Sequence, residues 1–212
     1  MKVCSLPYQV CLFLSVIGGA VLSPAICCAE AADPHAGHHH MMMAAMSAGT
    51  STSTAQYELP PIKLVRDDGK KVTLPQELND GRPVIVNFIY TSCTQICPVT
   101  SRTFTQLQSK LGAEREKVHL VSISIDPEQD TPAVLHAYAK RFEAGSGWSY
   151  YTGSSEASIA AQRAFDVYRG DKMNHAPVTL MRAAPGKSWV RIEGFASADD
   201  LLNKYREIMA PM

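Results

Sequence analysis

The amino-acid sequence predicts an α/β fold in which helices cover a central mixed sheet. Two apolar strands, each followed by a helix, lie in the first half of the chain's body, and a strand pair followed by a closing helix lies in the second half. Strand–helix–strand order requires a right-handed crossover and parallel pairing, whereas a hairpin adds antiparallel strands to the same sheet. A thioredoxin-like sandwich with an N-terminal β-hairpin satisfies this order.

The two central strands have the clearest patterns. Residues 83–90 (PVIVNFIY) and 118–125 (VHLVSISI) are nearly continuous in β-branched, aromatic or other apolar side chains, which is typical of strands buried on both faces. Ahead of them, Asp68-Gly69 separates two short apolar runs within residues 62–74 and predicts a β-hairpin.

Helical patterns follow these strands. Apolar residues fall along one face of residues 98–111. Asp130-Thr131-Pro132 combines a capping residue with a proline at the first helical position, and so predicts a helix over 132–142. The remaining predicted elements are a helix over 155–165, an antiparallel strand pair over 178–182 and 188–194, and an amphipathic helix over 198–209.

Composition and charge exclude several classes of protein. With 46% hydrophobic residues among 212, the chain is too apolar for a disordered protein, and no motif recurs at a repeat period. Its 20 Lys and Arg balance 20 Asp and Glu, and the sequence contains no basic patch that would attract DNA or RNA. We therefore expect no nucleic-acid partner and one globular domain over residues 57–212.

Residues 1–31 have the features of an export segment. Lys2 precedes an apolar run over 10–22, and Ala29-Glu30-Ala31 offers a cleavage site, which is the pattern of a signal peptide. The alternative is an uncleaved membrane anchor, because the longer run over 10–29 has about the ~20 residues that a spanning helix needs. Either way we expect the remainder to be exported, to the periplasm or the outer face of the inner membrane.

Residues 32–56 predict a flexible tether, because small residues dominate and no apolar periodicity is present. Eight imidazoles and thioethers crowd into twelve positions there, and these groups are ligands for copper, the softer sulfur suiting Cu(I). The tether is therefore a candidate auxiliary metal segment, with a low-complexity linker or a tag remnant as the alternative. The candidate ligands are His35, His38, His39, His40, Met41, Met42, Met43 and Met46.

Two of the six cysteines form the main site candidate. Cys4, Cys11, Cys27 and Cys28 lie in or beside the export segment, which leaves only Cys93 and Cys97 in the body. Pro98 suits the first helical position, so we expect Cys97 at the helix N-cap and Cys93 in the turn before it. Unpaired N–H groups at a helix start favour thiolate over thiol, and thiolates bind soft metals and attack disulfides. A plain disulfide or two buried thiols without chemistry is the third alternative.

Copper(I) bound by two thiolates would be satisfied further by a third, neutral ligand. Outside the tether the chain has only His119, His136 and His175. His119 falls within a predicted strand and His136 within a predicted helix, so we expect packing or surface roles for both. His175 lies in a polar loop (GDKMNHAPV) that leads into the predicted sheet, and taken alone it favours an ordinary loop role over a ligand role.

Two motifs resemble those of the Sco/SenC copper proteins. They are FIYTSCTQICPVT at 88–100 and SISIDPEQDTP at 122–132, followed by the late loop histidine, and the resemblance covers about residues 57–210. It implies a thioredoxin-like fold and a copper chaperone that assembles the binuclear copper centre of cytochrome c oxidase. By position, Cys93, Cys97 and His175 match the copper ligands of that family. One departure is Asn174, where the family commonly has an acidic residue.

The resemblance also implies partners and a supporting residue. Copper is the expected ligand, as Cu(I) and in some states Cu(II), and the expected partner is a copper-accepting oxidase subunit or another periplasmic copper protein. Asp126 follows a strand next to the cysteine strand, which suits a role in orienting a ligand, or simply in ending the strand. For Asp130 and Thr131 we expect helix capping. A thiol–disulfide reductase, which would itself need a thiol reductant, and a copper- or redox-responsive regulator are the rival functions.

Overall fold

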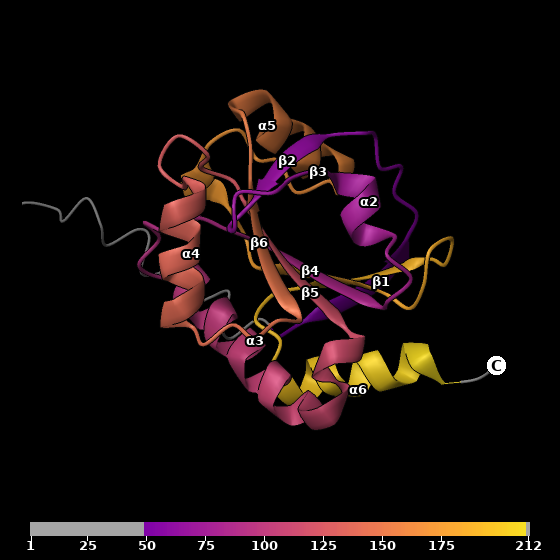
Figure 1. The fold of residues 1–212 in the computed structure, drawn as a ribbon. Helices are drawn as coiled ribbons and strands as arrows, with labels where there is room; N and C mark the ends of the chain where they lie inside the picture. The colour runs from indigo at the N-terminus through magenta and orange to yellow at the C-terminus, as the bar shows by residue number, and fades with distance from the viewer. Residues whose placement is uncertain (1–48, 211–212) are drawn as a thin grey trace, which may run out of the picture. The chain divides into compact units, whose positions relative to one another are not determined.

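The computed structural model describes residues 49–210, which form a mixed sheet with helices on both faces. Within these residues the sheet has eight strands in the order β1-β8-β7-β4-β5-β6-β2-β3 (Figure 1). The strands are β1 Ser51–Ala55, β2 Lys63–Arg66, β3 Lys71–Thr73, β4 Val84–Ile89, β5 His119–Ser124, β6 Trp148–Thr152, β7 Val178–Arg182 and β8 Trp189–Glu193. The helices are α2 Leu74–Leu78, α3 Ile96–Leu111, α4 Pro132–Arg141, α5 Ser155–Ala164 and α6 Ala198–Met209, with short 3₁₀ turns η1 Gly112–Lys117 and η2 Lys172–Asn174.

Parallel pairing is confined to the centre of the sheet. β4, β5 and β6 run parallel to one another through the crossovers that contain α3 and α4, and the flanking strands are antiparallel. Every residue of β4 and β5 is buried, because helices cover both faces. The predicted α/β fold with a central mixed sheet and an N-terminal hairpin is therefore confirmed.

Alternation along β4 divides the core between the two faces. Ile85 and Ile89 pack with residues of α3, α4 and α6, whereas Val86 and Phe88 pack with residues of α2 and α5. Figure 1 shows α3 and α6 below the sheet and α2 and α5 above it. This packing holds β4 in place on both faces, and so it fixes the position at which the loop after its carboxyl end begins.

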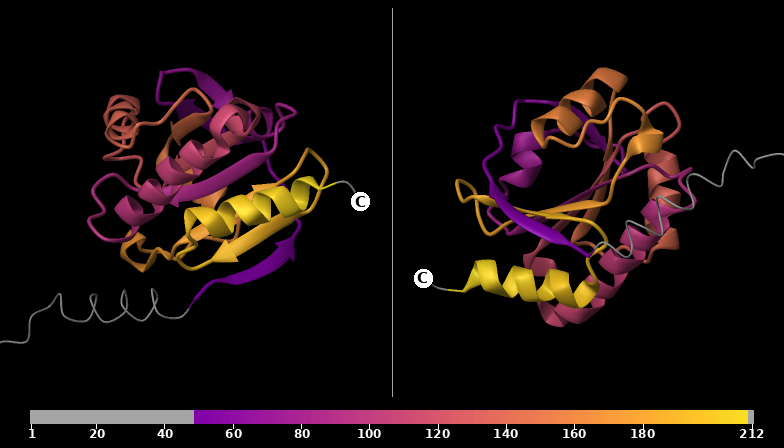
Figure 2. Two further views of the ribbon diagram at one scale, coloured as in Figure 1. Left: turned by 90° about the horizontal axis from the view of Figure 1, so that it is seen from below. Right: turned by 180° about the vertical axis from the view of Figure 1, so that it is seen from behind.

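The predicted tether is wrong over residues 51–55. These residues form the edge strand β1, which pairs antiparallel with β8 from Ser51 opposite Glu193 to Ala55 opposite Trp189 (Figure 2). The segment STSTA escaped prediction because its small polar side chains are mostly exposed and show no apolar alternation, while its backbone groups still complete a sheet edge. Residues 1–48, which include the predicted export segment and the eight tether ligands, lie outside the described residues.

Two elements were missed, and one local prediction was wrong. β6 and α2 were not predicted: the first is a short aromatic run and the second only five residues long. Helix α3 begins at Ile96 with Gln95 at its N-cap, so Cys97 is the second helical residue and not the cap. Proline is tolerated throughout the first turn, where N–H groups lack helical partners, and Pro98 therefore did not mark the first position.

Candidate metal centre

The two cysteines lie where the central strand β4 turns into α3. The Cys93 N–H donates to the Tyr90 carbonyl at 3.2 Å, which closes the turn directly after the strand. Cys97 is completely buried, and Cys93 is 8% exposed. Both are free thiols, so the alternative of a plain disulfide is not what the structure contains.

Backbone donors hold the two sulfurs close together. The Cys97 N–H donates to Cys93 Sγ at 3.3 Å, and the Tyr90 N–H donates to Cys97 Sγ at 3.4 Å. The Tyr90 side chain also contributes to lowering the pKa of Cys93. Hydrogen bonds of this kind stabilise negative charge on sulfur in a site from which water is largely excluded.

The thiols differ strongly in acidity. The Cys97 thiol donates to the Cys93 sulfur, and with the N–H groups of Cys97 and Gln95 it lowers the pKa of Cys93 to about 5. The same interaction, together with burial, raises the pKa of Cys97 above its ordinary value. At neutral pH the pair is thus one thiolate and one thiol. A soft cation would meet a preformed anionic ligand and would displace one proton from the second.

Asp130 is a residue whose role the sequence prediction missed. It does not cap α4: that part is played by Thr131, whose hydroxyl accepts from the Val134 N–H at 3.3 Å. The fully buried Asp130 carboxylate instead accepts from the Ser124 hydroxyl at 2.6 Å and from the hydroxyl and N–H of Thr91. Burial raises the pKa of this carboxyl. Because Thr91 begins the cysteine loop, Asp130 ties that loop to the end of β5.

Asp126 lies at the end of β5 and bonds to the histidine loop. Its Oδ2 accepts from Lys172 Nζ at 2.6 Å, and this hydrogen bond raises the pKa of Lys172. Lys172 Nζ also lies 5.7 Å from the centre of the Tyr90 ring. Asp126 therefore positions the loop that carries His175 against the strand that carries the cysteines.

The buried His175 ring is held by a hydrogen bond to the backbone of β4. Its Nε2 lies 3.0 Å from the Phe88 carbonyl on β4. A carbonyl can only accept, so Nε2 carries the proton and Nδ1 holds the free lone pair. Burial lowers the pKa of His175, which keeps the ring neutral near pH 7 and suited to binding metal.

The structure brings the two cysteines together but does not close a three-ligand cluster. Across residues 49–210, no three side chains of His, Cys, Asp or Glu are arranged to hold a metal ion. His119 contacts Glu77, Asp80 and Tyr151 at the opposite end of the strands, and His136 pairs with Asp67. Both contacts agree with the packing and surface roles expected for them.

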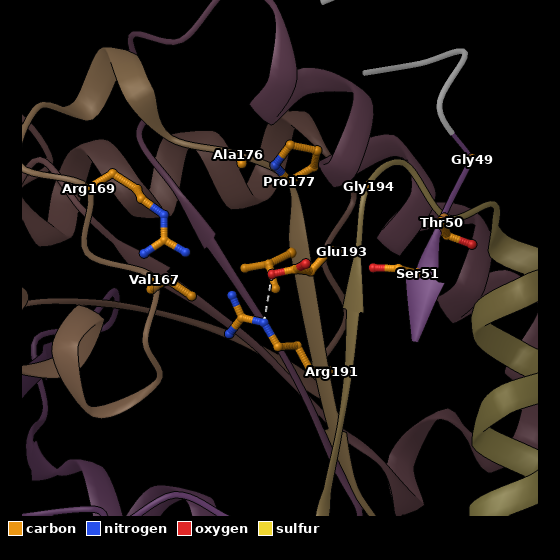
Figure 3. Close-up of a pocket in the computed structure, with 11 residues that line it drawn as sticks. Gly49, Thr50, Ser51, Val167, Arg169, Ala176, Pro177, Arg191, Glu193 and Gly194 are labelled. Atoms are coloured by element: carbon orange, nitrogen blue, oxygen red, sulfur yellow. Dashed lines mark hydrogen bonds and ion pairs between the residues drawn. The ribbon is translucent and has the colours of Figure 1, made fainter. Parts of the chain in front are cut away.

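A pocket of about 410 Å³ lies on the other side of the histidine loop (Figure 3). Ala176 and Pro177 line it together with Gly49 and Thr50, which precede β1, and with Arg191, whose Nε donates to Glu193 at 2.9 Å. No cysteine lines this pocket. Its relevance is positional: the chain enters the sheet beside the loop that contains His175. None of the helices within residues 49–210 is long and apolar enough to cross a membrane.

Comparison with known proteins identifies the family. The SCO1/SenC family model matches residues 50–210. The SCO1 protein homolog of Bacillus subtilis is 38% identical over 104 residues, which cover 49% of this chain and 53% of that protein. Protein SenC of Rhodobacter capsulatus is 28% identical over 144 residues, 68% of this chain and 63% of that protein. Against the first three curated relatives, the matched part spans 53%, 31% and 42% of their own length.

Solved structures agree in fold. Arabidopsis thaliana ScoI with copper bound has a TM-score of 0.60 and 29% identity, over 71% of this chain and 96% of that one. BsSco, described as having a disulfide switch and as a member of the Sco family of cytochrome c oxidase assembly proteins, has a TM-score of 0.58 and 29% identity, over 74% and 96%. The resemblance carried by the two sequence motifs is thereby confirmed, and the chain belongs to the SCO1/SenC family.

Proposed function

We propose that this chain is a copper chaperone. It binds one copper ion through Cys93, Cys97 and His175 and delivers it to the binuclear copper centre of cytochrome c oxidase or to a related copper-accepting protein. The observation that carries the proposal is the thiolate–thiol pair fixed at the end of β4, with the Cys93 pKa lowered to about 5. Paired sulfur ligands of this type select soft Cu(I).

The pair suits uptake and release by ligand exchange. Cys93 attacks the arriving copper as a thiolate, and Cys97 binds as its proton leaves to solvent, so no electron is transferred. The neutral His175 ring joins when it leaves the Phe88 carbonyl and turns toward the cysteines. It then offers the lone pair of Nδ1 or, once the ring proton has moved from Nε2 to Nδ1, the lone pair of Nε2. An added imidazole nitrogen also suits Cu(II).

The relatives support copper and an oxidase acceptor. The Arabidopsis ScoI structure contains copper, and BsSco belongs to a family of cytochrome c oxidase assembly proteins. We place the acceptor outside the cytoplasm, in the periplasm or at the outer face of the inner membrane, because residues 1–31 have the pattern of an export signal or anchor.

The His/Met tether is proposed as an auxiliary copper-collecting segment. Its last candidate ligand, Met46, is only three residues before Gly49, so the two lie within about 11 Å of each other along the chain. Gly49 in turn lines the same pocket as Ala176 and Pro177, next to His175 (Figure 3). Copper held by the tether would therefore start near the loop that carries His175.

A specific observation also favours the rival function, a thiol–disulfide reductase. One acidic and one buried, high-pKa thiol is the arrangement in which the first attacks a disulfide and the second resolves the mixed disulfide. The substrate disulfide would gain two electrons and two protons, and Cys93–Cys97 would become a disulfide that a thiol reductant must restore.

His175→Ala separates the two functions. The full chain, loaded with one equivalent of Cu(I), is mixed with a purified copper-accepting oxidase domain, and transferred copper and reduced acceptor disulfides are measured separately. The chaperone proposal predicts that the variant transfers copper at least about ten-fold less well and keeps wild-type reductase activity. Unimpaired copper transfer by His175→Ala would contradict the ligand role of the imidazole. If the wild type reduces the acceptor disulfide but transfers no copper, the reductase function is favoured. His136→Ala, at an exposed histidine that pairs with Asp67 and contacts neither cysteine in the hydrogen bonds of the site, is the matched control.

A further inference from the structure

A third sulfur lies beside the cysteine pair. Met173 is 55% exposed, one of the few large apolar side chains in residues 49–210 that are open to solvent. Its Sδ accepts from the Tyr90 hydroxyl at 3.8 Å. The backbone of Tyr90 contacts both cysteines, because its N–H donates to Cys97 Sγ and its carbonyl accepts from the Cys93 N–H. The thioether and the cysteine pair therefore both contact Tyr90.

The backbone of Met173 is held while its side chain is free. The Asp171 carboxylate accepts from the Met173 N–H at 2.9 Å, and the preceding Lys172 pairs with Asp126 at 2.6 Å. No helix or strand packs over the Met173 side chain, since more than half of it is exposed. A methionine side chain has three rotatable bonds, so its sulfur can reach toward Cys93 without any movement of the backbone.

Packing does not account for an exposed methionine at this position, but metal chemistry does. A thioether is a soft, neutral ligand that favours Cu(I) over harder cations. It is also neutral at every pH, so it adds no charge to a site that already contains a thiolate. In the described structure the Met173 side chain is exposed, whereas the His175 ring is buried and bonded to Phe88.

We propose that Met173 is an additional ligand of Cu(I), supplying a third sulfur to the ion bound by Cys93 and Cys97. The proposal rests on the copper-binding function proposed above and deepens it by naming a ligand beyond the two cysteines and the histidine. A Cu–S bond forms as a ligand of the copper donor leaves, and no electron is transferred. Because Met173 is exposed, it is also the ligand that an incoming or departing copper ion meets first.

X-ray absorption of the Cu(I)-loaded full chain tests this directly. Cys4, Cys11, Cys27 and Cys28 are first replaced by Ser, and Met41, Met42, Met43 and Met46 by Leu, so that the sulfur neighbours of one equivalent of copper come from the body. We expect three sulfur neighbours, two in Met173→Leu, and a Cu(I) affinity in that variant at least about ten-fold lower. Met209→Leu, at an exposed methionine in α6, is the matched control and should change neither value.

The outcomes separate this proposal from the function on which it rests. If the parent protein binds Cu(I) with two sulfur neighbours and Met173→Leu leaves the count and the affinity unchanged, the thioether is not a ligand although the chaperone function stands. If the parent protein does not bind Cu(I) tightly at all, the chaperone function itself is contradicted. Urea unfolding checks that Met173→Leu is as stable as the control variant.

Discussion

Cys93 should make the stability of the reduced, copper-free protein depend on pH. Its folded-state pKa of about 5 lies well below the ~8.5 of a free cysteine. The unfolded chain therefore binds the proton more tightly, and the thiolate stabilises the fold fully above the unfolded pKa, an effect lost as pH falls through 5. Integrating the proton linkage gives a loss of about 2.3 kcal/mol in the free energy of unfolding between pH 7 and pH 5.

The comparison that isolates this effect is the wild type against Cys93→Ser. Urea unfolding is measured at pH 5, 6 and 7 with a thiol reductant and a copper chelator, and the difference in free energy of unfolding between the two proteins should shrink by about 2 kcal/mol over that range. Met209→Leu is the control: it replaces an exposed side chain that does not titrate, so its difference from wild type should stay constant. A Cys93→Ser difference that does not change with pH would refute the thiolate assignment.

Three other predictions follow from the contacts of the site. Asp130→Ala leaves the Thr91 N–H, the Thr91 hydroxyl and the Ser124 hydroxyl without their acceptor, so the free energy of unfolding in urea should fall by roughly 3 kcal/mol or more. Asp130→Asn should lower it by less, because the amide keeps one acceptor oxygen. Equal losses in the two variants would contradict this account. Asp126→Asn breaks the part-exposed ion pair with Lys172, so the free energy of unfolding should fall by no more than about 1 kcal/mol. The Cu(I) affinity should fall about ten-fold, and an unchanged affinity would show that Asp126 does not support the site. Copper uptake should release about one proton per Cu(I) at pH 7 and about two near pH 4, because only the second thiol is protonated at neutral pH. An indicator dye in weak buffer measures the released protons. Release of two protons at pH 7 would contradict the thiolate–thiol pair.

The regular part of the fold was predictable because its patterns are local. β4 and β5 were predicted to within one residue at each end, since strands buried on both faces are apolar throughout, and β7 and α6 were predicted with their observed bounds. β1 was not predictable in this way. It depends on a backbone edge that β8 leaves open, and its own side chains have no buried face to reveal it.

The site was predictable in its sulfur ligands and less so in its surroundings. Cys93 and Cys97 follow from a short segment between a strand and a helix, which sequence spacing describes well. The role of Asp130 depends on folding it back beside Thr91, which lies 39 positions earlier in the chain, and the neighbouring capping residue Thr131 hid this role. Met173 had no signal of its own, because a single methionine in a polar loop is uninformative until a neighbouring sulfur and hydroxyl are in place.

The most direct test of copper binding by the cysteine pair is competition for Cu(I) between the full chain and a chromophoric chelator. The tether histidines and methionines, and the four cysteines at positions 4, 11, 27 and 28, are first replaced so that they do not contribute. We predict one tightly bound Cu(I) for the protein with both cysteines and none for the Cys93→Ser/Cys97→Ser variant. Tight, stoichiometric Cu(I) in the double variant would contradict the account.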